Sequence, residues 1–110
     1  EWMLEALSNL VKNALEHTKS GGHIEVLLEE TPLIVNIIVK DNGEGIHPDD
    51  INHIFKRFYR SKFSQNKQGT GIGLTLTKSI IEMHDGFISV ENEVEQGTKF
   101  IVHLPKLTKL

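Results

Sequence analysis

The chain has 110 residues, of which 38% are hydrophobic and 25% are charged, which is the size and composition of one globular domain. Its formal net charge of −3 gives it no general attraction for nucleic acid or for an anionic membrane surface. The absence of cysteine excludes disulfide bonds and thiolate metal sites, and no apolar run approaches the roughly 18 residues of a membrane span.

The first predicted element is a helix over residues 2–17. Met3, Leu7, Leu10 and Ala14 recur at helical spacing and form an apolar stripe, while the opposite side is polar. The glycines of the stretch KSGG, which follows, end this helix.

Two strands are predicted next. In HIEVLLE (23–29), apolar residues recur at alternate positions, so they would share one face of a strand. LIVNIIVK (33–40) is almost entirely apolar and β-branched, which indicates a central strand. Residues 47–60 open with Pro48 and two acids, a combination that favours the first turn of a short helix. The polar stretch 61–68 predicts a loop.

The C-terminal part contains a second long helix over 71–84 and two strands at 86–93 and 98–104. The strands therefore come in hairpin pairs, and helices lie between the pairs. This order predicts an α+β sandwich with one sheet and helices on one face, and it argues against a doubly wound parallel sheet.

Three glycines, Gly69, Gly71 and Gly73, alternate in the stretch KQGTGIGLTL just before the second long helix. The spacing fits neither the Rossmann fingerprint nor the Walker loop. Glycine nevertheless lets a backbone approach an anion, and a helix N-terminus offers free N–H groups. The stretch is thus either a phosphate cradle or a flexible lead into the helix.

A second candidate site is D-N-G-E-G-I (41–46), at the end of the predicted central strand. The Asp41 carboxylate could accept a hydrogen bond from an amino group such as that of adenine, and Gly43 and Gly45 would let the backbone turn closely around it. The alternative is a plain turn, because Asp, Asn and Gly are common turn residues.

The third candidate is a polar row on the first helix. Asn9, Asn13 and His17 are four residues apart and share one side of the helix. An amide oxygen suits Mg²⁺ that also binds phosphates. The alternatives are a solvated helix face and, for His17, a packing or capping role at the helix end.

Together these segments form five ordered motifs that resemble the catalytic ATP-binding domain of sensor histidine kinases, in the GHKL superfamily with gyrase and MutL. The motifs are N-x-x-x-N-A-x-x-H-T (9–18), D-N-G-E-G-I (41–46), F-x-x-F-Y-R (55–60), G-T-G-I-G-L (69–74) and G-T-x-F (97–100). Each motif is weak alone, but five in order over almost the whole chain are specific.

The resemblance implies the GHKL, or Bergerat, fold: one mixed, mostly antiparallel sheet with helices on one face. It also implies that residues 1–110 are a single catalytic domain from a longer protein, truncated at the N-terminal edge and without the dimerisation and phosphoacceptor domain. We expect the lost edge to expose a strand or to swap with another chain, and a clean monomer in light scattering would argue against this.

The resemblance places Mg²⁺ and the phosphates of ATP beside the first helix. Asn13 would bind the metal, Asn9 would support it, and His17 would lie near the phosphates or the sugar. Asn9, Asn13 and Arg60 are the implied catalytic residues, and Arg60 is a candidate contact to the γ-phosphate. The implied phosphate cradle consists of Gly69, Thr70, Gly71, Gly73 and Leu74.

On the adenine side, the resemblance implies that Asp41 binds the adenine amine. Gly43, Gly45 and Ile46 would wall the pocket, and Thr98 would help through the hydrogen-bond network of Asp41.

The lid over the nucleotide would comprise Arg60 and the loop 61–68. Its base would be anchored by Phe55, Phe58 and Tyr59.

The implied function is transfer of the γ-phosphoryl group to an external histidine. Hydrolytic relatives resemble E-x-x-x-N at the positions of Asn9 and Asn13, and their Glu activates water. Asn9 replaces this Glu, and an amide is not a general base, so we predict negligible ATP hydrolysis. None of the six histidines has the phosphoacceptor context H-[ED]-[LI]-[RK]-x-P. The implied partners are the protein's own dimerisation domain and a response regulator, without nucleic acid or direct membrane contact.

The parent would be a homodimeric membrane sensor with this domain in the cytoplasm. Two alternatives remain: a GHKL ATPase or serine kinase, and a module that binds a nucleotide without transferring phosphate.

Overall fold

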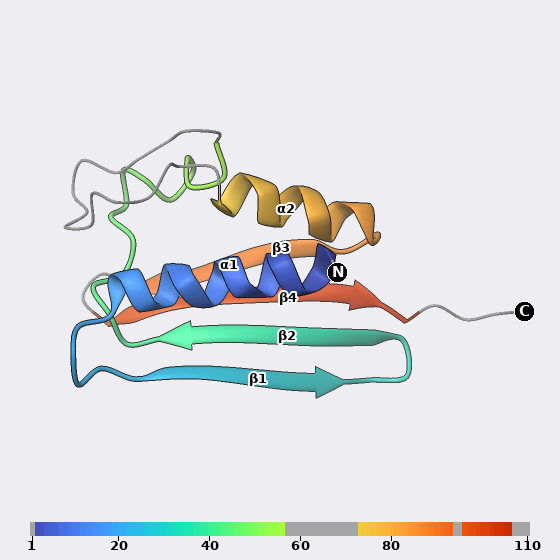
Figure 1. The fold of residues 1–110 in the computed structure, drawn as a ribbon, viewed down its shortest axis with the longest axis horizontal. Helices are drawn as coiled ribbons and strands as arrows, with labels where there is room; N and C mark the ends of the chain where they lie inside the picture. The colour runs from blue at the N-terminus through green and yellow to red at the C-terminus, as the bar shows by residue number, and fades with distance from the viewer. Residues whose placement is uncertain (1, 57–72, 94–95, 107–110) are drawn as a thin grey trace, which may run out of the picture.

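The computed structural model describes residues 2–56, 73–93 and 96–106. In this part of the chain the elements are α1 (Trp2–His17), β1 (Ile24–Glu30), β2 (Ile34–Asp41), α2 (Gly73–Met83), β3 (Phe87–Glu93) and β4 (Gly97–Pro105) (Figure 1). The two predicted long helices and the four predicted strands lie within one or two residues of these bounds wherever the structure describes them.

The four strands form one sheet in the order β1-β2-β4-β3. β1 pairs with β2 and β3 with β4 as the two predicted hairpins, and β2 pairs with β4 to join them. All three pairings are antiparallel, whereas the resemblance implied a mixed sheet. The central position expected for the 33–40 segment is confirmed, because β2 has a neighbour on each side.

Both helices pack on the same face of the sheet, so the predicted α+β sandwich is confirmed (Figure 1). The apolar stripes of the helices meet the alternate residues of β2 and β4 that point toward them. The buried core consists of Ala6, Leu10, Ala14, Val39, Ile80, Ile81, Phe100 and Val102. No helix in the described ranges is long and apolar enough to span a membrane.

The short helix predicted at 47–60 is wrong over residues 47–56, and residues 57–60 lie outside the described structure. Hydrogen bonds connect residues three apart, from His47 to Asp50, from Asp50 to His53 and from His53 to Lys56, and they do not overlap. These bonds form a series of turns and not an α-helix. An α-helix needs overlapping hydrogen bonds, in which each residue bonds to the fourth one on. The His47 ring also accepts a bond from the Asp49 amide, which offers the backbone a local alternative to helix.

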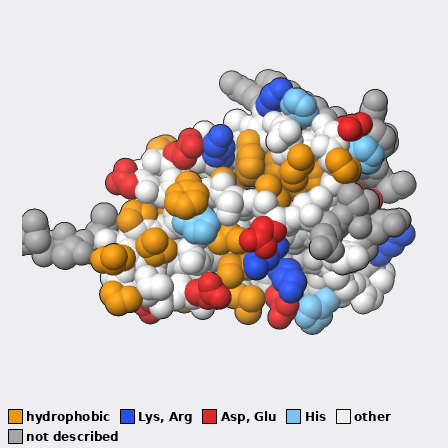
Figure 2. Space-filling view, turned by 180° about the vertical axis from the view of Figure 1, so that it is seen from behind, with side chains coloured by type: hydrophobic (Ala, Val, Ile, Leu, Met, Phe, Trp, Pro, Cys, Tyr) orange, Lys and Arg blue, Asp and Glu red, His pale blue; other side chains and the backbone are white. Residues whose placement is uncertain are grey.

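On the opposite face of the sheet, which neither α1 nor α2 covers, the described side chains are a mixture of hydrophobic and charged groups (Figure 2). Phe87 stacks on the ring of His103, with ring centroids 4.2 Å apart. Both ring nitrogens of His103 are hydrogen-bonded, Nε2 with Ser89 at 3.0 Å and Nδ1 with Asn36 at 2.9 Å. This cluster ties β2, β3 and β4 together from the side away from the core.

Candidate functional site

α1, β2 and β3 finish at one end of the molecule, and β1, β4 and α2 begin there (Figure 1). The candidate residues at these ends are His17, Asp41, Thr98 and Gly73. The fold therefore brings together four of the five segments that the sequence analysis selected, although they are far apart along the chain.

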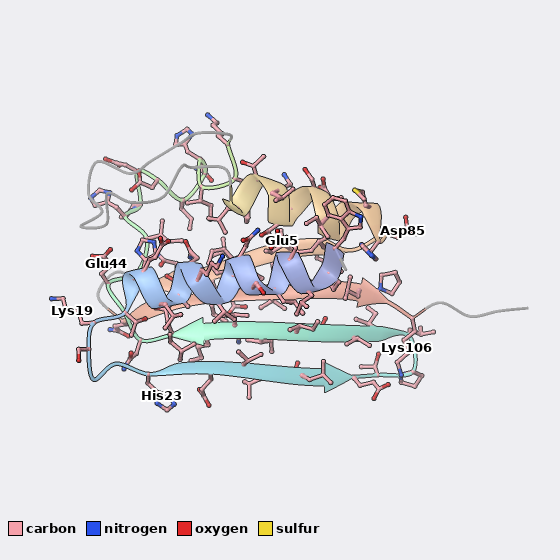
Figure 3. The ribbon with its side chains drawn as sticks, in the orientation of Figure 1. Glu5, Lys19, His23, Glu44, Asp85 and Lys106 are labelled. Atoms are coloured by element: carbon pink, nitrogen blue, oxygen red, sulfur yellow. The ribbon has the colours of Figure 1, made fainter. Side chains whose placement is uncertain are left out.

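The loop 42–47, which follows β2, is attached to the end of α1. The amide of Glu44 donates to the carbonyl oxygen of His17 at 3.3 Å, and the Glu44 carboxylate lies 3.1 Å from His17 Nδ1. Figure 3 shows Glu44 beside this end of α1. His17 thus has the packing role at the helix end that the sequence analysis left open, and its predicted place near a nucleotide remains a proposal.

The same loop is attached to the start of β1. The Asn42 side chain accepts a bond from the His23 amide at 2.7 Å, and the Asn42 amide donates to the His23 carbonyl at 3.1 Å. Sequence reasoning did not select Glu44 or Asn42, because each looked like an ordinary turn residue.

Asp41 is the last residue of β2, as predicted, and its side chain is only 5% exposed. One carboxylate oxygen, Oδ1, accepts a bond from the Gly43 amide at 2.8 Å, which is the local turn contact expected of Asp. The other oxygen, Oδ2, has no hydrogen-bond partner among the described residues. A carboxylate oxygen with no partner, on a residue that is otherwise buried, is suited to an external N–H donor.

Thr98 is buried at the start of β4, but its hydroxyl does not contact the Asp41 carboxylate. It donates instead to Asn92 Oδ1 at 3.0 Å. The same Asn92 side chain binds the backbone of Ile46 through both of its polar atoms, at 2.6 Å each. The sequence analysis missed Asn92, although a polar residue in line with the inward-facing Ile88 and Val90 was a signal that could have found it.

Asn9 and Asn13 are half-buried on the side of α1 that also carries His17, so this side is not the fully solvated face considered as an alternative. Their amide groups form no hydrogen bond with another described residue and keep their oxygens available. Within the described ranges, no three His, Asp or Glu side chains are grouped as a metal site. A cation at Asn13 would take its further oxygens from water or from a bound ligand.

The first turn of α2 has the features of an anion site. Gly73 has no heavy atom within 4 Å of the position where a Cβ would stand, and the turn contains no acidic residue. Among the described residues, no acidic side chain of this turn neutralises the partial positive charge of the helix N-terminus. Leu74, the other described member of the predicted cradle, packs against the core.

Phe55, expected at the base of the lid, packs edge-on against Phe100 with ring centroids 6.3 Å apart. Its carbonyl accepts a bond from the Thr75 hydroxyl of α2 at 2.7 Å. The remaining predicted site residues, which lie outside the described structure, are Phe58, Tyr59, Arg60, Gly69, Thr70 and Gly71.

Comparison with known families agrees with this arrangement. The family described as "Histidine kinase-, DNA gyrase B-, and HSP90-like ATPase" matches residues 1–108. The chain belongs to this family. The sensor protein SrrB of Staphylococcus aureus is 42% identical over 106 residues, which cover 94% of this chain and 18% of that protein. The chain thus spans less than a fifth of this relative's length.

Solved structures of this ATPase family share the fold. The mycobacterial sensor histidine kinase MprB superposes with a TM-score of 0.84 at 29% identity, over 92% of this chain and 70% of that one. The catalytic domain of the histidine kinase ThkA gives a TM-score of 0.78 at 35% identity, over 92% of this chain and 65% of that one. The predicted membership of the histidine kinase group of ATPase domains is confirmed.

Proposed function

We propose that this domain binds ATP with Mg²⁺ and transfers the γ-phosphoryl group to a histidine on a dimerisation domain of the same kinase or of its partner subunit. The observation that carries the proposal is the meeting of the Asp41 carboxylate, the polar side of α1 and the open N-terminus of α2 at one end of the sheet. These features offer an acceptor for a base amine, amide oxygens for a cation and N–H donors for phosphate.

The adenine end of the nucleotide is assigned to Asp41, whose free oxygen accepts the amino group. Guanine presents a carbonyl oxygen at the corresponding position, so the carboxylate would repel it and select ATP. Ile46, Gly43 and Gly45 form the loop beside Asp41 and wall this part of the site. The loop is attached to α1 and β1, so these walls are in place before the nucleotide arrives.

The phosphate end is assigned to α1 and α2. The available amide oxygens of Asn9 and Asn13 fit a hard divalent cation, with Asn13 as the ligand and Asn9 in support. Mg²⁺ bound there would neutralise the charge that develops on the transferred phosphoryl group. The N–H groups at Gly73 and Leu74 would bind phosphate oxygens, and Arg60 is assigned to the γ-phosphate.

The reaction breaks the bond between the γ-phosphorus and the bridging oxygen, and forms a phosphorus–nitrogen bond to an imidazole nitrogen of the acceptor. ADP leaves with the electron pair of the broken bond. This domain contributes orientation and charge stabilisation, because the nucleophile belongs to the acceptor. The amide of Asn9 cannot activate water, so transfer is favoured over hydrolysis.

The proposed reaction requires two partners, the phosphoacceptor domain and a response regulator downstream. The relatives named above are a sensor protein and histidine kinases, which supports a parent with a signalling role. The proposal includes a homodimeric parent that is a membrane sensor with this domain in the cytoplasm.

Calorimetric titration with a non-hydrolysable Mg·ATP analogue tests the binding step. We expect binding that is lost without Mg²⁺ and lost in Asp41→Ala, while the matched control Asp49→Ala, at an exposed position, binds normally. Failure of the unaltered domain to bind would refute the proposal. Single-turnover transfer of labelled phosphate to a phosphoacceptor domain then separates a kinase from a module that only binds nucleotide.

A further inference from the structure

The side chain of Asn92 holds the backbone of Ile46 as a neighbouring strand would. Asn92 Oδ1 accepts from the Ile46 amide and Asn92 Nδ2 donates to the Ile46 carbonyl, at 2.6 Å each. Both polar groups of one peptide position are thus satisfied by one amide side chain. The link spans 46 residues of sequence and joins the loop after β2 to strand β3.

The Ile46 backbone fixes which way the Asn92 amide faces, and Thr98 adds a hydrogen bond to that orientation. The Thr98 hydroxyl donates to the same Oδ1 atom at 3.0 Å, so the oxygen receives two hydrogen bonds. A flipped amide would place an NH₂ group against the Ile46 N–H and a carbonyl against the Ile46 carbonyl, with both pairs mismatched. Thr98, Asn92 and Ile46 therefore form one hydrogen-bond network that runs from β4 through β3 to the loop.

Among the described residues, this hydrogen-bond network links the loop to β3. An open pocket of about 380 Å³, lined by Pro48, Ile51, Val90 and Asn92, lies beside this link. The other attachments of the loop, at His17 and His23, lie on the α1 and β1 side. Loss of the Asn92 amide would leave Ile46 without its hydrogen-bonded partner on β3.

We infer that Asn92 is a positioning residue for the adenine side of the nucleotide site, acting through Ile46 and supported by the hydrogen bond from Thr98. The inference rests on the proposed function, because it takes Ile46 as part of the wall beside the adenine. Thr98 would then affect nucleotide binding through Asn92 and Ile46. It would not need a hydrogen bond to Asp41, through whose network the sequence analysis expected it to act.

The test uses Asn92→Ala and Asn92→Asp, with Asn36→Ala as the matched control. Asn36 lies on β2, on the sheet face opposite the helices, and its side chain bonds His103 away from the site. The Asp variant keeps the shape of Asn but loses the donor, so it sets a carboxylate oxygen against the Ile46 carbonyl. Affinities for Mg²⁺ complexes of non-hydrolysable ATP and GTP analogues are measured by calorimetry for each variant.

We expect both Asn92 variants to bind the ATP analogue roughly 5- to 30-fold more weakly, the effect of losing one or two hydrogen bonds. Affinity for the GTP analogue should change less, so the preference for adenine falls. The Ile46 amide should also exchange its hydrogen faster and shift in the NMR spectrum, with or without nucleotide. A general loss of folding would weaken both analogues alike and shift amides throughout the sheet.

The outcomes separate the two claims. If the unaltered domain binds no nucleotide, the proposed function and the role of Asn92 both fail. If it binds and Asn92→Ala keeps the same affinity and base preference, the proposed function stands and the inference about Asn92 is wrong. An effect of Asn36→Ala as large as that of Asn92→Ala would also overturn it.

Discussion

The carbonyl oxygen of His17 stands where a side chain at position 43 would have to begin. A Cβ atom added to Gly43 would come 2.0 Å from this oxygen, far inside contact distance. The end of α1 and the loop after β2 can approach this closely only because residue 43 has no side chain. Gly43 thus allows two segments of the candidate site, the end of α1 and the loop after β2, to pack directly against each other.

Gly43→Ala is therefore expected to destabilise the domain by about 1–3 kcal/mol, the usual cost of overpacking, and to weaken nucleotide binding. The measurement is urea unfolding, followed by calorimetry on the folded variant. Gly73→Ala is the stability control, because nothing lies within 4 Å of its added Cβ, and it should be neutral or slightly stabilising. Equal losses of stability in both variants would contradict this account.

Phe100 connects the core to the base of the proposed lid, since it is buried and contacts Phe55. Phe100→Ala should cost about 3–5 kcal/mol of unfolding free energy through the cavity that it leaves. The matched variant Phe87→Ala removes a ring that is 58% exposed and stacked on His103, and should cost about 1 kcal/mol or less. Chemical denaturation of the two proteins gives the comparison, and similar midpoints would be inconsistent with the packing described.

Asp85 ends α2 in a left-handed conformation with φ of +62°. The amides of Asp85 and Gly86 bond to the carbonyls of Glu82 and Ile81, the pattern of a Schellman cap, whose left-handed position normally carries glycine. Figure 3 places Asp85 at this end of α2, away from Glu44. Asp85→Gly should raise the unfolding free energy by about 0.5–1 kcal/mol.

Thermal and urea unfolding measure that gain. Asp85→Ala, which keeps the Cβ atom, should show none, and a gain of the same size in the Ala variant would assign the effect to charge.

The hydrogen bond from the Lys106 ammonium to Glu30, and then its charge, lower the pKa of the Glu30 carboxyl, against a small opposing effect of desolvation. A lowered folded-state pKa stabilises the domain above the ordinary pKa of the carboxyl, and this stabilisation is lost as pH falls through the lowered value. NMR titration of Glu30 should show a pKa that rises to the ordinary range in Lys106→Ala. High salt should act in the same direction, because the pair is exposed.

Sequence reasoning succeeded where the information is local or repeats with a fixed period. The apolar stripe of α1 and the continuous apolar run of β2 identified a surface helix and a central strand, because these periods directly reflect which faces are buried. It failed at residues 47–56, where a favourable first-turn composition was outweighed by local side-chain hydrogen bonds and isolated turns. Helix start signals describe the first turn and say little about whether a second follows.

The order of elements, the positions of Asp41 and the polar side of α1, and the family could all be predicted from residue type and spacing along the chain. The contacts between the segments could not be predicted in this way. That Thr98 bonds Asn92, that Asn92 holds Ile46 and that Gly43 must admit the His17 carbonyl are relations between residues 6 to 46 positions apart. Such contacts depend on strand register and on the close approach of backbones, which no pattern of neighbouring residues records.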